Sequence, residues 1–440
     1  MPLTTKKLYT YFRKNNHVCT DSRKVQPNDL FFALKGPNFD GNVYADDALK
    51  RGATYAVIDN PEFQKSDRHL LVQDTLTALQ DLATYHLKEV KPICIAITGS
   101  NGKTTTKELI TSVLATTFNT QATIGNLNNH IGVPLTLLSL VDDTKMMIVE
   151  MGANHIDEIN FLCSIALPNF GLITNIGKAH LEGFGSVNGI VKAKGELFDF
   201  LDASGGHSFL NMNDFRVAKI GYFIQNASTY GSGEWYKTDV RMEGAEPFLK
   251  VNWYPKVQTG KNKRAILDPI DIQTQLIGAY NLDNVTAAIA VGSYFNVSAE
   301  NIKQAIEAYK PNNQRSQILE KNGNTIVLDA YNANPTSMEA ALQNFAKMKG
   351  ENKVVILGDM LEMGKESETE HLKLLKMLLE MKVSQVVLVG NELMKADKKR
   401  QFLHFQNTKD ARNWFDEQHF QNALILLKGS RSIALEKIVE

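Results

Sequence analysis

Residues 98–105 read Thr98-Gly99-Ser100-Asn101-Gly102-Lys103-Thr104-Thr105 and follow the apolar run 93–98. The next segment carries apolar residues at helical spacing. Strand, glycine loop and helix in this order are typical of a phosphate-binding loop, because glycines let backbone N–H groups surround phosphate oxygens at a helix N-terminus. We predict that residues 99–105 contact a nucleotide, with Lys103 on the β- and γ-phosphates and Thr104 on Mg²⁺. Ile97 stands where the usual pattern has glycine, so the loop is a variant, and an ordinary glycine-rich turn is the alternative.

The residues after this loop alternate between apolar strands and amphipathic helices. Strands are predicted at 93–98, 146–149 and 171–174, and a helix is predicted at 187–201. Such alternation is typical of a mostly parallel sheet covered by helices. Residues 205–275 lack the pattern, and we expect them to be irregular and to form an antiparallel addition.

Both ends of the chain repeat the α/β alternation. In the N-terminal part, strands are predicted at 30–34 and 55–58 and helices at 45–51 and 75–90, before Lys91-Pro92. In the C-terminal part, strands are predicted at 325–328, 353–357, 385–389 and 423–427. Polar residues follow several of these strands, and ligands bind beyond the carboxyl ends of strands in open α/β sheets. We therefore predict a second site-bearing face that meets the phosphate loop across a cleft.

Composition excludes several classes of protein. The 440 residues favour two or three domains, and 48 basic against 48 acidic residues argue against a protein that coats nucleic acid. No run reaches the roughly 18 apolar residues of a membrane span, and the N-terminus lacks the apolar core of a signal peptide. Cys19, Cys94 and Cys163 are widely separated, which predicts structural cysteines and fits the reducing cytoplasm.

Two charged residues occupy unusual positions. Glu150 ends the apolar strand 146–149, and an acid there, downstream of a phosphate loop, commonly serves the metal; a surface carboxylate is the alternative. Lys194 falls on the apolar stripe of helix 187–201, where a lysine loses its proton readily. A neutral amine can react with CO₂ to give a carbamate that faces a metal, whereas the alternative is a lysine that reaches to solvent.

Two polar segments are ambiguous when taken alone. His180 follows a strand, and a lone histidine is more often structural than a metal ligand. The asparagine-rich segment 125–129 offers amide donors and acceptors, and it is equally compatible with a simple turn.

In combination, these segments resemble those of the Mur ligase family. They occur in the same order as in the family, and the resemblance covers nearly the whole chain. Segments 21–24 and 30–36 look like the UDP-sugar-binding part, and residues 98–105 are similar to the ATP loop, Ile97 included. Segments 125–134 and 150–155 resemble those of members that add D-Ala-D-Ala. Segments 179–186 and 192–196 match the metal segment and the modified lysine, which implies functional roles for His180 and Lys194.

The resemblance assigns roles residue by residue. It implies that Lys103, Glu150, His180 and Lys194 are catalytic, and that Thr104, Glu150, His180 and carbamylated Lys194 hold one or two Mg²⁺. Besides the loop, the implied nucleotide contacts are Asn281, Arg315 and Asp329, although Arg315 follows Asn312-Asn313-Gln314 where many relatives have glycine before the arginine. The implied substrate contacts are Ser22, Arg23, Asn126, Asn128, Asn129, Tyr331, Asn332 and Asn334.

The family's fold and reaction follow as expectations. The resemblance implies three α/β domains: residues 1–91 bind the UDP-sugar, 92–311 form a parallel-sheet ATP-binding domain, and 312–440 form a Rossmann-like domain. The expected reaction joins D-Ala-D-Ala to UDP-MurNAc-tripeptide through an acyl phosphate at the expense of ATP. We expect a cytoplasmic monomer with small-molecule substrates and no nucleic-acid partner. The alternatives are a sister ligase, such as one that adds the third residue, and a nucleotide-binding regulatory protein without ligase activity.

Overall fold

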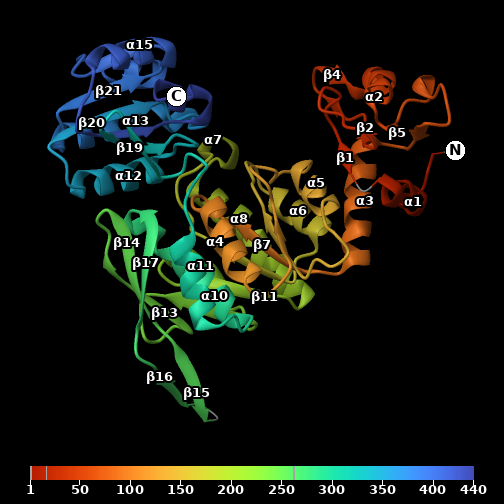
Figure 1. Ribbon diagram of the computed structural model, residues 1–440, viewed down its shortest axis with the longest axis horizontal. Coiled ribbons are helices and arrows are strands. Elements are labelled where there is room, and N and C mark those ends of the chain that lie inside the picture. Colours follow the sequence, from red (N-terminus) through yellow and green to blue (C-terminus); the bar gives the residue numbers. More distant parts are fainter. Residues whose placement is uncertain (1, 16, 261–262) are drawn as a thin grey trace.

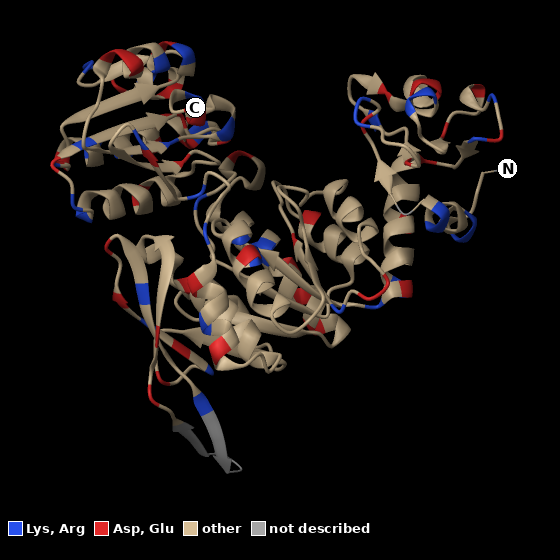
Figure 2. Ribbon diagram, in the orientation of Figure 1, with Lys and Arg blue, Asp and Glu red and all other residues tan. Residues whose placement is uncertain are grey.

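The computed structural model describes residues 2–15, 17–260 and 263–440, which form three bodies around separate sheets (Figure 1). The first and last bodies stand apart above the central one in this view. Basic and acidic residues are interspersed over all three bodies (Figure 2). No helix in the described part of the chain combines the length and apolar character needed to cross a membrane.

The N-terminal body is a four-stranded parallel sheet in the order β1-β2-β5-β6 with helices on both faces. Helix α3 extends from this body and packs against α5 (Gly132–Leu138) and α6 (Glu158–Ala166) of the central one. Asp74 caps the start of α3, and Lys91 ends it with a left-handed backbone before Pro92. The elements are α1 (Thr5–Asn15), β1 (Val18–Cys19), β2 (Leu30–Phe32), β3 (Lys35–Gly36), β4 (Phe39–Asp40), α2 (Ala45–Arg51), β5 (Tyr55–Ile58), β6 (His69–Leu71) and α3 (Thr75–Val90).

The central body is a nine-stranded sheet in the order β17-β14-β13-β12-β11-β10-β7-β9-β8. The strands from β8 to β13 pair in parallel, and β14 and β17 add antiparallel pairs at one edge. The strands are β7 (Ile93–Thr98), β8 (Thr120–Ala122), β9 (Met146–Glu150), β10 (Phe170–Ile173), β11 (His207–Asn211), β12 (Ala227–Gly231), β13 (Thr238–Gly244), β14 (Phe248–Tyr254) and β17 (Ile270–Ile277), with a separate hairpin of β15 (Lys256–Gly260) and β16 (Lys263–Ile266).

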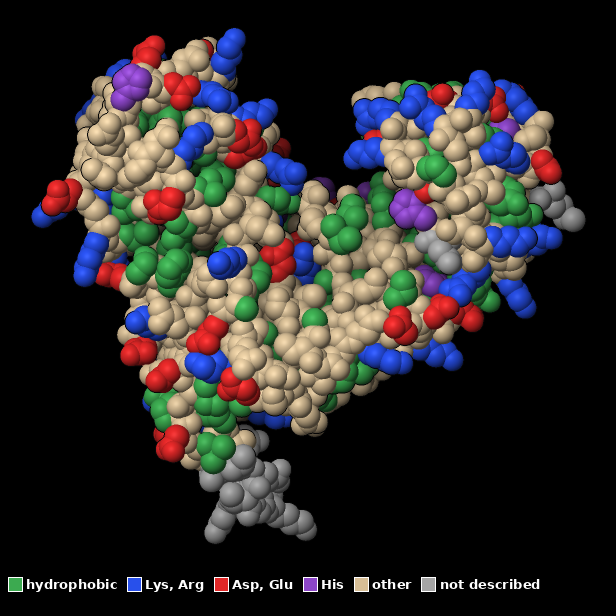
Figure 3. All heavy atoms as spheres, in the orientation of Figure 1, with side chains coloured by type: hydrophobic (Ala, Val, Ile, Leu, Met, Phe, Trp, Pro, Cys, Tyr) green, Lys and Arg blue, Asp and Glu red, His purple; other side chains and the backbone are tan. Residues whose placement is uncertain are grey.

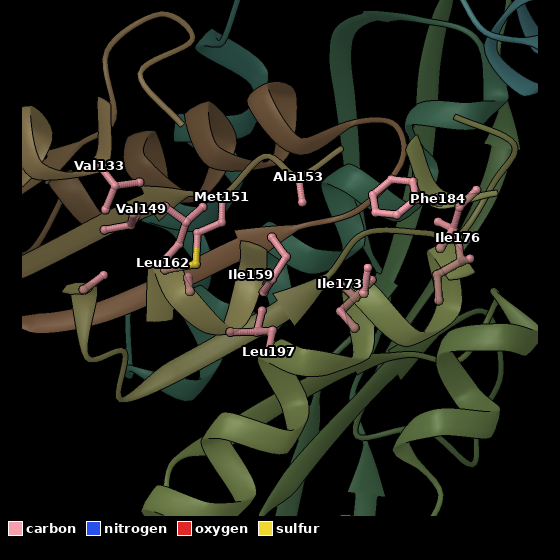
Figure 4. Packing of buried hydrophobic residues seen from close by; sticks show 14 of the residues in the cluster. Val133, Val149, Met151, Ala153, Ile159, Leu162, Ile173, Ile176, Phe184 and Leu197 are labelled. Atoms are coloured by element: carbon pink, nitrogen blue, oxygen red, sulfur yellow. The ribbon is translucent and has the colours of Figure 1, made fainter. Parts of the chain in front are cut away.

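Helices cover both faces of the central sheet because its inner strands are apolar on both sides. Helices α4, α10 and α11 bury one face, while α5, α6 and α8 bury the other. Figure 4 shows this second layer, where Val149 and Met151 meet Ile159 and Leu162. The helices are α4 (Lys103–Ala115), α5 (Gly132–Leu138), α6 (Glu158–Ala166), α7 (Leu181–Phe184), α8 (Val187–Ser204), α9 (Phe215–Gly221), α10 (Leu282–Tyr294) and α11 (Ala299–Ala308).

The C-terminal body is a six-stranded sheet in the order β18-β19-β23-β20-β21-β22, parallel except for β18. Helices α12, α13 and α14 cover one face and α15 the other. The elements are β18 (Gln317–Lys321), β19 (Asn324–Asp329), α12 (Pro335–Lys347), β20 (Asn352–Gly358), α13 (Ser367–Glu380), β21 (Gln385–Val389), α14 (Asn391–Ala396), β22 (Leu403–Phe405), α15 (Thr408–Gln418) and β23 (Ala423–Lys428).

The predicted fold class is confirmed, with one correction in residues 205–275. The antiparallel addition exists as β13, β14 and β17, but the first part of this range is regular rather than irregular: β11 and β12 continue the parallel sheet. Their polar residues hid the strand pattern. Those residues are buried because partners remote in sequence satisfy them: Asn211 Nδ2 donates to the Thr174 carbonyl over 2.7 Å, and His207 Nε2 lies 2.9 Å from Ser228 Oγ.

The three cysteines are buried and free, as expected of structural residues. Burial raises the pKa of the Cys94 thiol to about 12 and that of Cys163 further. Both thiols are therefore protonated and unreactive at neutral pH.

Candidate active site

A cleft of about 950 Å³ lies between the central and C-terminal bodies and is lined by residues of both. On the face drawn in Figure 3, a wide hollow also separates the N-terminal body from the C-terminal one. The central body contributes the phosphate loop, Glu150 and the segment 126–130, while the C-terminal part contributes the ends of β19 and β23. The predicted meeting of two polar faces across a cleft is therefore confirmed.

The phosphate loop is shaped by two glycines with positive φ. Gly99 has φ of 145° and Gly102 has φ of 79°, a conformation that residues with a Cβ rarely adopt. A Cβ on Gly99 would lie 2.0 Å from Thr174 Oγ1, and one on Gly102 would lie 2.4 Å from Asn284 Oδ1. Ile97 is fully buried inside β7, so the variant position belongs to the sheet core and the turn begins at Gly99.

The Lys103 ammonium lies within its own loop. Its Nζ donates to the carbonyl of Gly99 over 2.7 Å and to that of Ser100 over 3.3 Å. Burial lowers the pKa of Lys103, while the nearby Glu150 carboxylate opposes this shift. The amine is thus held by backbone acceptors that a phosphate oxygen can replace.

Glu150 is buried at the end of β9 and is held by two donors. Thr104 Oγ1 donates to Glu150 Oε2 over 2.8 Å, and Asn128 Nδ2 donates to Oε1 over 2.8 Å. The Asn128 carbonyl in turn accepts from the Gly152 N–H over 2.8 Å. These bonds place a carboxylate and a hydroxyl side by side, close to the loop.

Lys194 is buried in α8, which begins at the capping residue Ser186. Its side chain is 2% exposed, its Nζ lies 3.5 Å from the Ala153 carbonyl, and it lies over the Phe184 ring (Ala153 and Phe184 are labelled in Figure 4). Burial, and secondarily the charge on Lys103, lowers the pKa of Lys194 to about 7. The predicted apolar setting is confirmed, and a large neutral fraction of the amine exists at neutral pH.

His180 lies at the start of α7, where its φ is 51°. Its Nδ1 contacts the carboxylate of Glu362 from the C-terminal body, without the directional geometry of a hydrogen bond. This contact lowers the pKa of Glu362, although burial opposes the shift. The central and C-terminal bodies are therefore in contact at His180, the residue that the family resemblance implies is a metal ligand.

The side chains fit a magnesium ion in part. Thr104 and Glu150 offer adjacent oxygen ligands of the kind that Mg²⁺ prefers. Within residues 2–15, 17–260 and 263–440, no three His, Cys, Asp or Glu side chains converge as a metal-binding group. The Lys194 ammonium offers no lone pair, and Mg²⁺ prefers oxygen ligands to a neutral amine, so Lys194 suits a ligand role after conversion to a carbamate.

The C-terminal wall of the cleft centres on Tyr331. The guanidinium carbon of Arg315 lies 3.7 Å from the centroid of its ring, and that of Arg431 lies 4.8 Å from it. Beside it, Lys428 Nζ forms an ion pair of 2.7 Å with Asp329. Cationic and aromatic surface therefore faces the phosphate loop.

Asn281 is buried at the N-terminus of α10. Its Nδ2 donates to the Ile277 carbonyl over 2.8 Å, and its Oδ1 accepts from Asn284 Nδ2 over 2.8 Å. Thr106 Oγ1 of the loop helix then donates to Asn284 Oδ1 over 2.9 Å. Asn281 is thus connected to α4 by side-chain hydrogen bonds.

The structure does not bring every predicted site residue into the cleft. Ser22 and Arg23 belong to the N-terminal body, where Arg23 is exposed and pairs with Asp21 over 2.8 Å. Gly99, Thr104, Lys194 and Asn334 do not line the cleft either, and Asn334 contacts Asn101 instead. The predicted residues that do line it are Ser100, Asn101, Gly102, Lys103, Thr105, Asn126, Asn128, Asn129, Glu150, His180, Asn281, Arg315, Asp329, Tyr331 and Asn332. Their assigned roles stay predictions.

Several cleft residues were given no individual role from the sequence. Lys428 and Arg431 follow the strand predicted at 423–427 and lie on the predicted site-bearing face, and Asn175 follows the strand predicted at 171–174. Asp157, Glu158, Asp283 and Glu362 gave no such positional signal, because they sit at helix starts or in a loop.

Comparisons with known proteins agree with this architecture. Three family models match in chain order: the Mur ligase family catalytic domain at residues 15–86, the Mur ligase middle domain at 97–292, and the Mur ligase glutamate ligase domain at 314–431. A Bacillus subtilis protein named UDP-N-acetylmuramoyl-tripeptide–D-alanyl-D-alanine ligase is 34% identical, with 96% of this chain and 92% of that protein covered.

Two solved structures share the fold. The crystal structure of MurF from Acinetobacter baumannii is 30% identical with a TM-score of 0.85, covering 100% of this chain and 98% of that one. The crystal structure of MurF ligase from Thermotoga maritima in complex with ADP is 24% identical with a TM-score of 0.84, covering 97% and 96%. With all three domain models matched and a relative of this identity along almost its full length, the chain belongs to the Mur ligase family.

Proposed function

We propose that this enzyme joins D-Ala-D-Ala to UDP-MurNAc-tripeptide, with hydrolysis of ATP to ADP and phosphate, in the synthesis of peptidoglycan precursors. The observation that carries the proposal is the full-length similarity to a ligase of that name, together with a cleft in which the phosphate loop faces Arg315, Tyr331 and Arg431. The ADP named with the Thermotoga maritima structure supports a nucleotide in this cleft.

The reaction has two covalent steps. A carboxylate is a poor electrophile at neutral pH, so one of its oxygens first takes the γ-phosphoryl group of ATP, and ADP leaves. The free amine of D-Ala-D-Ala then attacks the carbonyl carbon of the acyl phosphate. The tetrahedral intermediate loses phosphate and a proton, which leaves the new amide.

The residues of the loop bind and orient the phosphates. Lys103 exchanges the carbonyls of Gly99 and Ser100 for β- and γ-phosphate oxygens and stabilises the charge that moves during transfer. Thr104 and Glu150 would hold Mg²⁺, which when bound neutralises phosphate charge. Asn128 keeps the Glu150 carboxylate in place for this purpose.

We further propose that Lys194 reacts with CO₂ and acts as a carbamate. Its burial and its pKa of about 7 support this, because only the neutral amine is nucleophilic toward CO₂. The carbamate would carry negative charge and, with His180, would supply ligands for Mg²⁺. His180 must then exchange its contact with Glu362 for the metal.

Each of the three bodies has its own role in this proposal. Residues 1–91, with Ser22 and Arg23, bind the UDP-sugar end of the substrate. Residues 92–311 bind ATP, and residues 312–440 close the cleft. Asn126, Asn129 and Asn332 are proposed substrate contacts, supported by their place on the cleft wall. We propose a monomer and a cytoplasmic location, and the second suits three free cysteines.

The test is phosphate release by the purified protein with ATP, Mg²⁺ and UDP-MurNAc-tripeptide, with and without D-Ala-D-Ala. Tripeptides with lysine and with diaminopimelate at position three are both assayed. Dipeptide-dependent release with a UDP-pentapeptide of the expected mass supports the proposal. Release with UDP-MurNAc-dipeptide and a single diamino acid, in place of the tripeptide and D-Ala-D-Ala, would identify a sister ligase that adds the third residue. ATP binding without turnover on any of these substrates would indicate a regulatory protein.

A further inference from the structure

One hydrogen bond connects the phosphate loop directly to the C-terminal body. Asn334 Nδ2, at the start of α12, donates to Asn101 Oδ1 over 2.7 Å. The side chain of Asn334 is nearly inaccessible, with the residue 6% exposed. Close by, the Lys178 N–H donates to Thr336 Oγ1 over 3.1 Å, so the first turn of α12 is docked on the central body by two bonds.

The orientation of the Asn334 amide is fixed within its own helix. Its Oδ1 accepts from the Ser337 N–H over 3.0 Å, and the Ser337 hydroxyl accepts from the Asn334 N–H over 3.1 Å, which completes a capping box. Because the oxygen is used by the cap, the nitrogen is the atom that points toward Asn101.

The orientation of the Asn101 amide follows from this donor. Its Oδ1 must face Asn334 Nδ2, which leaves Asn101 Nδ2 as a buried donor with no partner among the described residues. The backbone of Asn101 is held separately: its N–H donates to Asn175 Oδ1 over 3.1 Å, and its carbonyl accepts from Thr174 Oγ1 over 2.6 Å. Only the side-chain amide of Asn101 therefore depends on the C-terminal body.

We propose that Asn334 is a positioning residue for nucleotide binding: it orients the Asn101 amide so that Nδ2 donates to a phosphate oxygen of the bound nucleotide. A buried amide donor without an acceptor costs free energy, and an anionic oxygen in the cleft removes that cost. The nucleotide meets this donor only while the start of α12 is docked. Nucleotide affinity and docking of the C-terminal body are thus coupled, and the inference rests on the proposed nucleotide role of the cleft.

The decisive variant is Asn334→Ser. Serine caps a helix about as well as asparagine, but its hydroxyl is too short to replace Nδ2 at Asn101. We expect cooperative thermal unfolding that changes by no more than the loss of one interdomain hydrogen bond implies. Dissociation constants for ADP, by titration calorimetry on the full chain, should rise by about 3- to 10-fold, the range of one lost hydrogen bond. In turnover assays the KM for ATP should rise more than kcat falls.

Two comparisons separate this role from a general structural effect. Asn407→Ser alters the equivalent cap of α15, where Asn407 Oδ1 accepts from the Asp410 N–H over 3.0 Å, and should leave ADP affinity unchanged. In an Asn101→Ala background, Asn334→Ser should cause no further loss. Equal ADP affinity of Asn334→Ser and the parent, or the same loss in both backgrounds, would overturn the proposal. A parent chain that does not bind ADP would instead overturn the nucleotide role of the cleft.

Discussion

Asn128 donates from Nδ2 to Oε1 of Glu150 over 2.8 Å, at the point where β9 reaches the cleft. The other carboxylate oxygen accepts from Thr104, so the rotamer of Glu150 is fixed from both sides. Asn128 was predicted to contact substrate, and that role stays a prediction. The structure adds a contact with the carboxylate that is proposed to hold the metal.

Asn128→Ala should weaken the response to magnesium. Without its amide, Glu150 loses one of two donors and samples other rotamers, and loss of such supporting bonds typically costs about 10- to 100-fold in metal affinity. The measurement is the Mg²⁺ concentration for half-maximal phosphate release. Asn126→Ala, on the same segment, should leave that concentration unchanged, and an unchanged value for Asn128→Ala would contradict the positioning role.

Lys103→Ala should lower turnover by about 10²-fold or more, because it removes the charge that stabilises the transferring phosphoryl group. The variant should keep its unfolding temperature, since among the described residues the ammonium donates hydrogen bonds only to backbone carbonyls of its own loop. The measurement is kcat for dipeptide-dependent phosphate release. Near-normal turnover of the variant would contradict the assignment of residues 98–105 as the ATP-binding loop.

Activity should depend on bicarbonate through Lys194. Its pKa of about 7 keeps much of the amine neutral and reactive toward CO₂ at neutral pH. The parent should lose activity in CO₂-free buffer, regain it with bicarbonate, and show a carbamate signal with ¹³C-bicarbonate in NMR. Lys194→Ala should be inactive at any bicarbonate concentration, whereas Lys192→Ala, on the exposed side of α8, should behave like the parent. If the activity of the parent does not change with bicarbonate and no carbamate signal appears, the result contradicts carbamylation of Lys194.

The ion pair between Lys178 and Glu370 should make the docking of the C-terminal body sensitive to acid. Burial alone would raise the pKa of Glu370, but hydrogen bonds from Lys178, at 2.8 Å, and Lys373 lower it. A carboxyl whose pKa is lowered by folding contributes stability that is present above its unfolded pKa of about 4.3 and is lost as pH falls through the folded value.

Glu370→Gln should therefore lower stability at pH 7 by about 1–3 kcal/mol, and the difference from the parent should shrink below about pH 4. Thermal unfolding at the two pH values measures this. Glu368→Gln on the same helix removes an exposed pair with Lys398 and should have little effect at either pH. A Glu370→Gln difference that stays constant with pH would refute the ion-pair explanation.

The sequence predicted the local elements of the fold closely. Segments 45–51, 55–58, 75–90, 93–98 and 385–389 match α2, β5, α3, β7 and β21 as the structure has them. Each is bounded by short-range signals, such as the Gly52 end of α2 or the Asp74 cap of α3. Strand β2 ends two residues earlier than predicted, at Phe32, because the apolar run continues beyond the paired residues.

The sequence was a poor guide where burial depends on distant partners. Strand β11 carries His207 and Asn211, which look like surface residues until Ser228 and the Thr174 carbonyl are placed beside them. The same reasoning applies to Glu362, a loop residue with no motif, which meets His180 only because two bodies are in contact.

By itself, then, the sequence determined the phosphate loop, the alternation of strands and helices, and the family to which the chain belongs. All three depend on residue types at short, fixed spacings, which act through backbone conformation and periodic burial. The tertiary structure alone decided that Asn128 holds Glu150, that Asn334 reaches Asn101, and that His180 faces Glu362. These pairs are set by how sheets and domains pack, because a hydrogen bond or an ion pair requires two atoms within about 3–4 Å, and no local pattern encodes that distance across 22 to 233 residues.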